Sequence, residues 1–235
     1  MKTLRTRIAD IIEMCALVAV PATLLWCAVR SYEHTALLTL IVALGSVLPF
    51  FLRFESAKPR PRDFMPIVVL AALAAAGRIV FGPLPNVMPV TAIVIVAGAC
   101  FGKEGGFLTG ALAALTSNMF FGQGPWTPWQ MYAWGLVGFV AGVLFFGRTQ
   151  SVSLVAVLAY GLLSSLCYGI LLDSWHVVGF ISPLNWKSAL AGYAAGIPFN
   201  VGHALSTVVF LTLIYKPWIK KIDRIKLKFG ITSQS

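Results

Sequence analysis

Residues 118–134 read Asn-Met-Phe-Phe-Gly-Gln-Gly-Pro-Trp-Thr-Pro-Trp-Gln-Met-Tyr-Ala-Trp, and they interrupt a long hydrophobic sequence. Two prolines and two glycines favour turns, while three tryptophans and three amide side chains add aromatic and polar surface. A segment that only turns between helices rarely carries so much aromatic mass. We interpret this stretch, here called the aromatic lip, as the edge of a binding site.

The composition on both sides of the lip is that of a protein that lies in lipid. Hydrophobic residues make up 58% of the chain and charged residues 11%, against about 25% charged residues in soluble domains. The mean hydropathy is +0.84. Backbone groups must be hydrogen-bonded internally in hydrocarbon, and long apolar runs without alternation favour helices over a barrel. The sequence therefore predicts an all-α integral membrane protein.

We expect eight apolar segments, although a perpendicular span takes roughly 20 residues and the fourth and fifth are shorter. They cover residues 8–29, 35–52, 64–81, 89–102, 106–121, 131–147, 151–172 and 189–215. A connector rich in proline and basic residues, 53–63, separates an N-terminal hairpin from the rest. We divide the chain there into a hairpin with its linker, residues 1–57, and a core with a basic tail, residues 58–235.

The basic residues predict the orientation. All but three of the 18 Lys and Arg residues fall on one side of the eight-span arrangement, and Arg30, Arg78 and Lys187 are the exceptions. The positive-inside rule places the crowded side in the cytoplasm. We expect a multi-pass protein of the inner or plasma membrane, with both termini cytoplasmic and the lip facing outward. Topology and anionic lipid also explain the net charge of +10, so no nucleic-acid partner is expected.

The lip supplies the first candidate binding residues. Tryptophan rings offer flat apolar faces and amides offer donors and acceptors, the usual mixture in a small-molecule pocket. The candidates here are Trp126, Trp129, Trp134, Gln123, Gln130 and Asn118, the last of which can equally cap its helix.

Four further candidates lie outside the lip. Arg78 lies about one turn from the outer end of its helix, where it either snorkels to headgroups or binds a carboxylate or phosphate of the ligand. Asn86 lies in a turn, where asparagine often serves backbone geometry alone. Asn200 and His203 share a face of the last helix near mid-membrane, and cross-helix hydrogen bonding is the alternative role for His203.

Small residues at helical spacing indicate close helix packing. Glycine pairs four apart occur at 98 and 102, 106 and 110, 138 and 142, and 192 and 196. The third segment carries two alanine stripes, Ala71 with Ala75 and Ala72 with Ala76. Such a stripe either packs internally or docks onto another membrane subunit.

Two other functional classes remain alternatives. An intramembrane hydrolase needs a nucleophile and a base at one depth, but Ser206 points away from His203 on their helix. A metal transporter favours clustered His or Cys ligands, whereas the three histidines are scattered. We therefore predict neither enzymatic activity nor a metal site nor a bound cofactor, with a solitary small-molecule transporter as a further alternative.

The segment from Ala71 to Gly142 resembles the substrate-binding S-components of energy-coupling factor (ECF) vitamin transporters. The resemblance rests on Gly77-Arg78, Leu84-Pro85-Asn86-Val87-Met88-Pro89-Val90, Phe101-Gly102-Lys103-Glu104-Gly105-Gly106, and Ser117-Asn118 leading into the lip. Residues 64–216 match the six-helix plan of that family, and the hairpin before them departs from it. The Gly-Gln-Gly-Pro-Trp-Thr-Pro-Trp run is similar to one branch that includes cobalamin-specific members.

This resemblance implies a capture subunit that binds a vitamin outside and delivers it inward. The implied partners are a transmembrane coupling subunit, contacted through Ala71, Ala72, Ala75 and Ala76, and two ATPase subunits. The chain has no phosphate-loop motif, so ATP hydrolysis is expected in the partners. Cobalamin is the first expected cargo.

Overall fold

The computed structural model describes residues 2–30, 35–56 and 60–231, and these ranges contain seven helices and no strand. Each helix is long and apolar enough to cross a membrane. The chain is thus a multi-pass, all-α membrane protein, as the sequence predicted. The helices are α1 (Lys2–Arg30), α2 (Thr35–Ser56), α3 (Pro61–Val80), α4 (Val90–Phe121), α5 (Trp126–Phe145), α6 (Leu154–Phe180) and α7 (Trp186–Phe229).

Local sequence signals explain several helix ends. Proline stands at the first position of α3, where its missing N–H costs no helical hydrogen bond. The Ser153 side chain caps α6, and Asn185 forms a capping box with Ser188 at the start of α7. The connector between α2 and α3 is shorter than the predicted 53–63, because α2 continues to Ser56 and α3 begins at Pro61. Residues 57–59 of that connector lie outside the described residues.

Helix α4 accounts for the difference between eight predicted segments and seven helices. It folds back on itself at Gly102, whose φ of 83° and ψ of −177° are not helical. A side chain is strained at such a φ, which glycine adopts freely. The two arms lie against each other, since a Cβ on Gly106 would come within 2.7 Å of the Gly98 Cα atom. The two short predicted segments therefore occupy the two arms of one folded helix.

Glycines bring the arms of α4 and helix α5 together. A Cβ on Gly98 would collide with the backbone oxygen of Gly138, and one on Gly138 would collide with Gly106. Farther along, Gly110 lies against the backbone of Trp134, and Gly142 lies against Lys103 at the reversal. The predicted close packing is present at these positions because only a missing side chain lets the backbones approach so closely.

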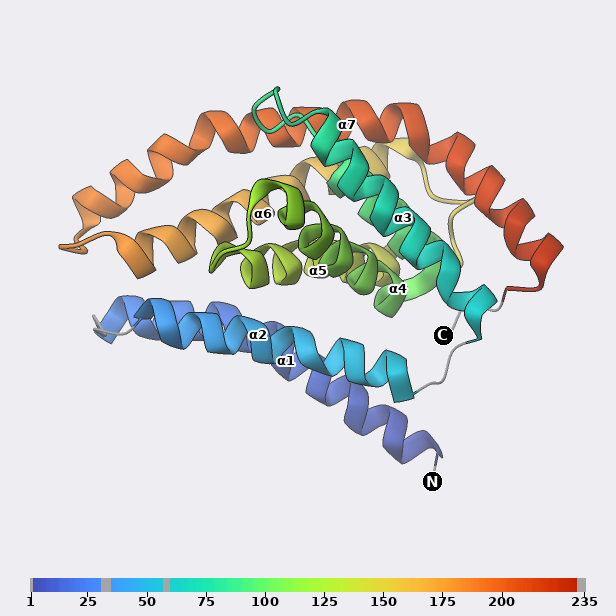
Figure 1. Cartoon of the computed structure of the whole chain (residues 1–235), viewed down its shortest axis with the longest axis horizontal. Coiled ribbons are helices and arrows are strands. Elements are labelled where there is room, and N and C mark those ends of the chain that lie inside the picture. The colour runs from blue at the N-terminus through green and yellow to red at the C-terminus, as the bar shows by residue number, and fades with distance from the viewer. Residues whose placement is uncertain (1, 31–34, 57–59, 232–235) are drawn as a thin grey trace.

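The N-terminal hairpin lies along one flank of the other helices, and the long, curved α7 runs along the opposite flank (Figure 1). An apolar seam joins the hairpin to the core. Phe50 of α2 stacks on Phe107 of α4 with ring centroids 3.6 Å apart, and Phe139 of α5 meets Phe50 edge-on. The Tyr132 hydroxyl of α5 also donates a hydrogen bond to the Leu17 carbonyl of α1.

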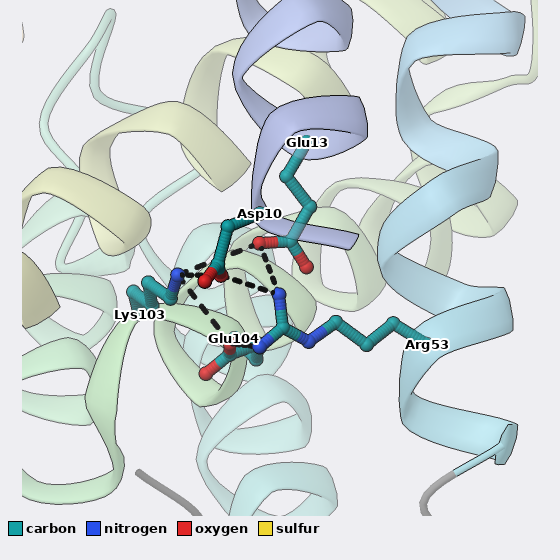
Figure 2. A network of polar contacts seen from close by, with 5 residues as sticks. All are labelled: Asp10, Glu13, Arg53, Lys103 and Glu104. Atoms are coloured by element: carbon teal, nitrogen blue, oxygen red, sulfur yellow. Dashed lines mark hydrogen bonds and ion pairs between the residues drawn. The ribbon is translucent and has the colours of Figure 1, made fainter. Parts of the chain in front are cut away.

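A network of charges closes the same interface at one end (Figure 2). The Arg53 guanidinium lies 2.8 Å from Asp10 and 2.9 Å from Glu13 of α1, and 3.1 Å from Glu104 of α4. Lys103 adds a contact of 2.7 Å to Asp10. Glu13 is 1% exposed, so its charge depends on these basic partners.

This network also identifies the basic end of the molecule. Arg53 and Lys103 meet there, and the Lys226 ammonium of α7 donates a 2.6 Å hydrogen bond to the Cys100 carbonyl beside the reversal. Gln150 of the α5–α6 loop contacts Asp223 of α7 nearby in the fold. Basic residues that the sequence assigned to one side thus gather at one end, and their cytoplasmic location stays a prediction.

Candidate functional site

Arg78 lies near the end of α3 that is opposite the basic end. Its guanidinium donates hydrogen bonds of 2.7 Å to the Ser117 hydroxyl and 2.8 Å to the Asn118 side-chain oxygen of α4. It also lies over the rings of Phe121 and Trp134, with its central carbon 5.0 and 5.1 Å from the two ring centroids. Within the described ranges, no carboxylate lies within ion-pair distance of Arg78. The site therefore holds a fixed, uncompensated positive charge.

Arg78 also lines a pocket of about 150 Å³. Its walls come from the end of α3, the turn before α4, and the end of α4. Asn86 in this turn has a φ of 55°, a left-handed conformation that asparagine tolerates better than most residues. The lining residues are Arg78, Phe81, Gly82, Leu84, Asn86, Val87, Met88 and Phe121. Arg78 and Asn86, both predicted site residues, thus share one pocket.

The amide side chains of the lip form hydrogen bonds that fix Asn118, the partner of Arg78. The Asn118 amide nitrogen donates to Thr127 at 3.0 Å and to Gln130 at 2.8 Å, and Thr127 donates to Gln123 at 2.8 Å. These contacts tie the end of α4 to the start of α5. The structure therefore brings the predicted candidates Asn118, Gln123 and Gln130 together. Their contacts with one another and with Thr127 hold Asn118 in place as the hydrogen-bond partner of Arg78.

The three tryptophans of the aromatic lip differ in their burial. Helix α5 begins at Trp126, so only residues 122–125 form a loop. Trp126 is 39% exposed, but Trp129 and Trp134 are completely buried. Trp129 stacks on Trp175 of α6 at 5.9 Å and packs in the hairpin seam. Helix α5 turns Trp129 and Trp134 inward, so they present no exposed ring face to a ligand, and their role in binding stays a prediction.

A second polar network includes Trp134, the ring over which Arg78 lies. The Trp134 indole N–H donates a 3.0 Å hydrogen bond to the Thr91 hydroxyl, which lies 2.8 Å from the His203 ring nitrogen. Tyr168 stacks on Trp134 and meets His203 edge-on. His203 is 3% exposed. It is therefore part of a buried network that supports Trp134, in agreement with the alternative of cross-helix bonding.

Asn200 takes part in a separate contact. Its amide nitrogen donates a 2.7 Å hydrogen bond to Asp173 of α6, next to Gly169 and Gly196. Neither Asn200 nor Asp173 lines the Arg78 pocket. The structure thus joins α6 to α7 through Asn200 and leaves it outside the pocket.

The two alanine stripes of α3 have different environments. Ala71 and Ala75 are buried within the chain, at 3% and 2% exposure. Ala72 and Ala76 are exposed on the outer surface of the helix. The first pair is therefore accounted for by internal packing, and only the second pair is available to a partner.

The charge network of Figure 2 was not predicted from the sequence as a cluster. The signal was present, because Asp10 and Glu13 interrupt the first apolar segment and intramembrane charges usually have partners. Oxygens of Asp10, Glu13 and Glu104 lie within 4.8 Å of one another, a spacing compatible with a metal ion. Arg53 and Lys103 contact all three carboxylates, so internal ion pairing explains the cluster without one.

Comparison with known proteins gives one family. A family model described as a family of unknown function (DUF6580) matches residues 58–220, and the chain belongs to that family. The match starts at the residue where we place the start of the core. No curated protein and no solved structure matches the chain.

Proposed function

We propose that this member of the DUF6580 family is the substrate-capture subunit of an ECF-type importer, and that it binds an anion-bearing micronutrient beside Arg78. The observation that carries the proposal is the uncompensated Arg78 guanidinium at the 150 Å³ pocket. An intramembrane charge without a counter-ion is costly, and such residues usually mark a ligand or ion site. The planar guanidinium binds carboxylate or phosphate through two parallel hydrogen bonds.

Preorganisation of Arg78 supports this role. Ser117 and Asn118 accept from the same guanidinium nitrogen, Nη1, so the other N–H groups remain for a ligand. Asn118 is in turn held by Thr127 and Gln130. A side chain fixed before binding loses less conformational freedom when the ligand arrives.

The number of helical segments after the hairpin is that of the six-helix plan. After the hairpin, the chain contains α3, the two arms of α4, and α5, α6 and α7. In the proposal these six form the S-component, and the hairpin is an addition on its flank. The exposed Ala72 and Ala76 form the surface for the coupling subunit, which brings two ATPase subunits.

The pocket limits what part of a cargo it encloses. A volume of about 150 Å³ accommodates an anionic group rather than a complete corrin ring. In the proposal, the phosphodiester of cobalamin or the carboxylate of a smaller vitamin enters the pocket, and the rest of the molecule lies above it. The half-exposed Trp126 is the available aromatic contact.

Binding to the purified chain in nanodiscs tests the proposal. The probes are cobalamin first, then biotin and pantothenate as carboxylates, with mass spectrometry of small molecules retained through a gentle purification. Arg78→Gln is expected to weaken binding about 30-fold or more, since loss of a buried charged contact costs about 2 kcal/mol or more. Arg78→Lys keeps the charge but loses the planar guanidinium that forms two parallel hydrogen bonds, and we expect an intermediate effect on binding.

The matched control is Arg30→Gln, which removes an arginine predicted on the same side and outside the pocket. Binding should remain unchanged in this variant. Equal affinity of Arg78→Gln and the parent for a bound probe would contradict the proposed site. Uptake by the chain alone, without copurifying ATPase subunits, would instead favour the solitary transporter.

A further inference from the structure

A second cavity, of about 250 Å³, lies toward the basic end of the protein. It is formed by the α5–α6 loop, the first residue of α6, and one face of α7. Polar lining comes from Thr149, Gln150, Lys216 and Lys220, and apolar lining from Val152, Leu154 and Ile219. Tyr215 completes the wall. This cavity shares no lining residue with the Arg78 pocket.

The charge of this cavity is positive. Lys216 and Lys220 are one helical turn apart and therefore lie on one face of α7. In the described part of the chain, neither ammonium has a carboxylate within ion-pair distance. The nearby Asp223 accepts a 2.9 Å hydrogen bond from Gln150. The positive end of the α6 dipole adds to the field, because Leu154 begins that helix.

Tyr215 gives a second, independent indication of a ligand. The residue is 2% exposed, and its hydroxyl has no hydrogen-bond partner among the described residues. Buried hydroxyls are normally paired, and an unpaired one calls for a missing water, ion or ligand. Tyr215 lines the same cavity as the two lysines.

The position of the cavity favours a lipid. Helix α7 has 44 residues, which is about 66 Å at 1.5 Å per residue, whereas the hydrocarbon core is about 30 Å thick. Its C-terminal part therefore extends beyond the core. Figure 1 shows α7 as one long, curved helix. Lys216 and Lys220 are the first charged residues after the long uncharged stretch of this helix. Basic pockets between helices at this level bind phospholipid headgroups in other membrane proteins.

We propose that the cavity between α6 and α7 binds the phosphate of an anionic phospholipid headgroup, with Lys216 and Lys220 as cationic partners and Tyr215 as a hydrogen-bond donor. The apolar wall of Val152, Leu154 and Ile219 suits the glycerol and the first acyl carbons. A free phosphate ion carries no apolar group that could pack against this wall. The proposal is independent of the function assigned to Arg78.

Native mass spectrometry of the full chain in mixed micelles tests the lipid site. Phosphatidylglycerol and phosphatidylcholine are added in equal amounts, and the lipid retained per chain is measured. The parent is expected to retain phosphatidylglycerol selectively. Lys216→Gln combined with Lys220→Gln should weaken this binding about 30-fold, whereas Lys221→Gln combined with Lys228→Gln should leave it nearly unchanged.

Tyr215→Phe provides a variant that keeps every charge. It should weaken phosphatidylglycerol binding several-fold while the protein elutes and unfolds like the parent. An equal effect of the two double-lysine variants, or no effect of Tyr215→Phe, would overturn the cavity as the site and leave surface charge as the cause. Binding of inorganic phosphate alone, with displacement of the lipid, would overturn the lipid assignment.

Discussion

Arg53 at the end of α2 and Glu104 just past the α4 reversal lie 3.1 Å apart and join the N-terminal hairpin to the core. Arg53 belongs to the part of the chain before residue 58, whereas Glu104 lies inside the range that matches the family. The same guanidinium contacts Asp10 and Glu13 of α1. One arginine therefore connects both helices of the hairpin to the folded helix at the centre of the core.

Reversal of this charge should release the hairpin. Arg53→Glu places a fourth carboxylate beside Asp10, Glu13 and Glu104, and the repulsion is expected to lower the thermal unfolding midpoint in detergent. Adding Glu104→Arg restores an opposite pair and should recover part of the loss. The matched control is Arg224→Glu, which reverses the same charge at an exposed position outside this network. If the double variant is no more stable than Arg53→Glu, the Arg53–Glu104 contact does not hold the interface.

The reversal at Gly102 gives a second prediction. Gly102→Ala forces a side chain onto a φ of 83° and should cost about 1–2 kcal/mol of stability. Gly45→Ala is the control, because its Cβ would meet nothing within 4 Å inside helix α2. Helix propensity favours alanine there, so stability should be equal or higher. Equal thermal midpoints for the two variants would contradict the folded form of α4.

Two tryptophans of the lip should respond differently to truncation. Trp129→Ala removes a fully buried ring from the seam with the hairpin and is expected to destabilise the fold by about 3–5 kcal/mol. Trp126→Ala removes a half-exposed ring and should change stability little. In the capture proposal, Trp126→Ala weakens ligand binding by about 1–3 kcal/mol. Unfolding curves and ligand titrations of the two variants separate these effects.

The alanine stripes allow a matched test of the partner surface. Ala71→Leu and Ala75→Leu enlarge buried positions and should destabilise the chain by about 1–3 kcal/mol. Ala72→Leu and Ala76→Leu enlarge exposed positions, so the isolated chain should remain stable and bind ligand normally. Copurification with the coupling subunit should nevertheless fall. Full association by the Ala72 and Ala76 variants would remove this surface from the proposal.

Reporter fusions test the orientation. Because basic residues gather at the end that holds Arg53 and Lys103, we expect reporters at either terminus to read as cytoplasmic. A C-terminal reporter on the outer side would contradict this orientation. It would also place the Arg78 pocket on the inner side and remove the capture role.

The sequence alone determined the class of the protein and its helical segments, because hydropathy and backbone hydrogen bonding act locally along the chain. The distribution of Lys and Arg likewise indicated which loops share a side. The close glycine contacts of Gly98, Gly106 and Gly138 could be anticipated, since four-residue spacing marks one helix face. Arg78 and Asn86 were identified as candidates from residue type and position.

Only the tertiary structure decided what each helix face meets. Trp129 and Trp134 look alike in sequence to Trp126, but the rotation of α5 buries the first two. In the same way, the rotation of α3 about its axis buries Ala71 and leaves the neighbouring Ala72 exposed. The partners of Arg78 and Arg53 come from helices far away in sequence, so no local pattern specifies them. Burial and charge pairing depend on helix orientation, which long-range packing sets after the spans have formed.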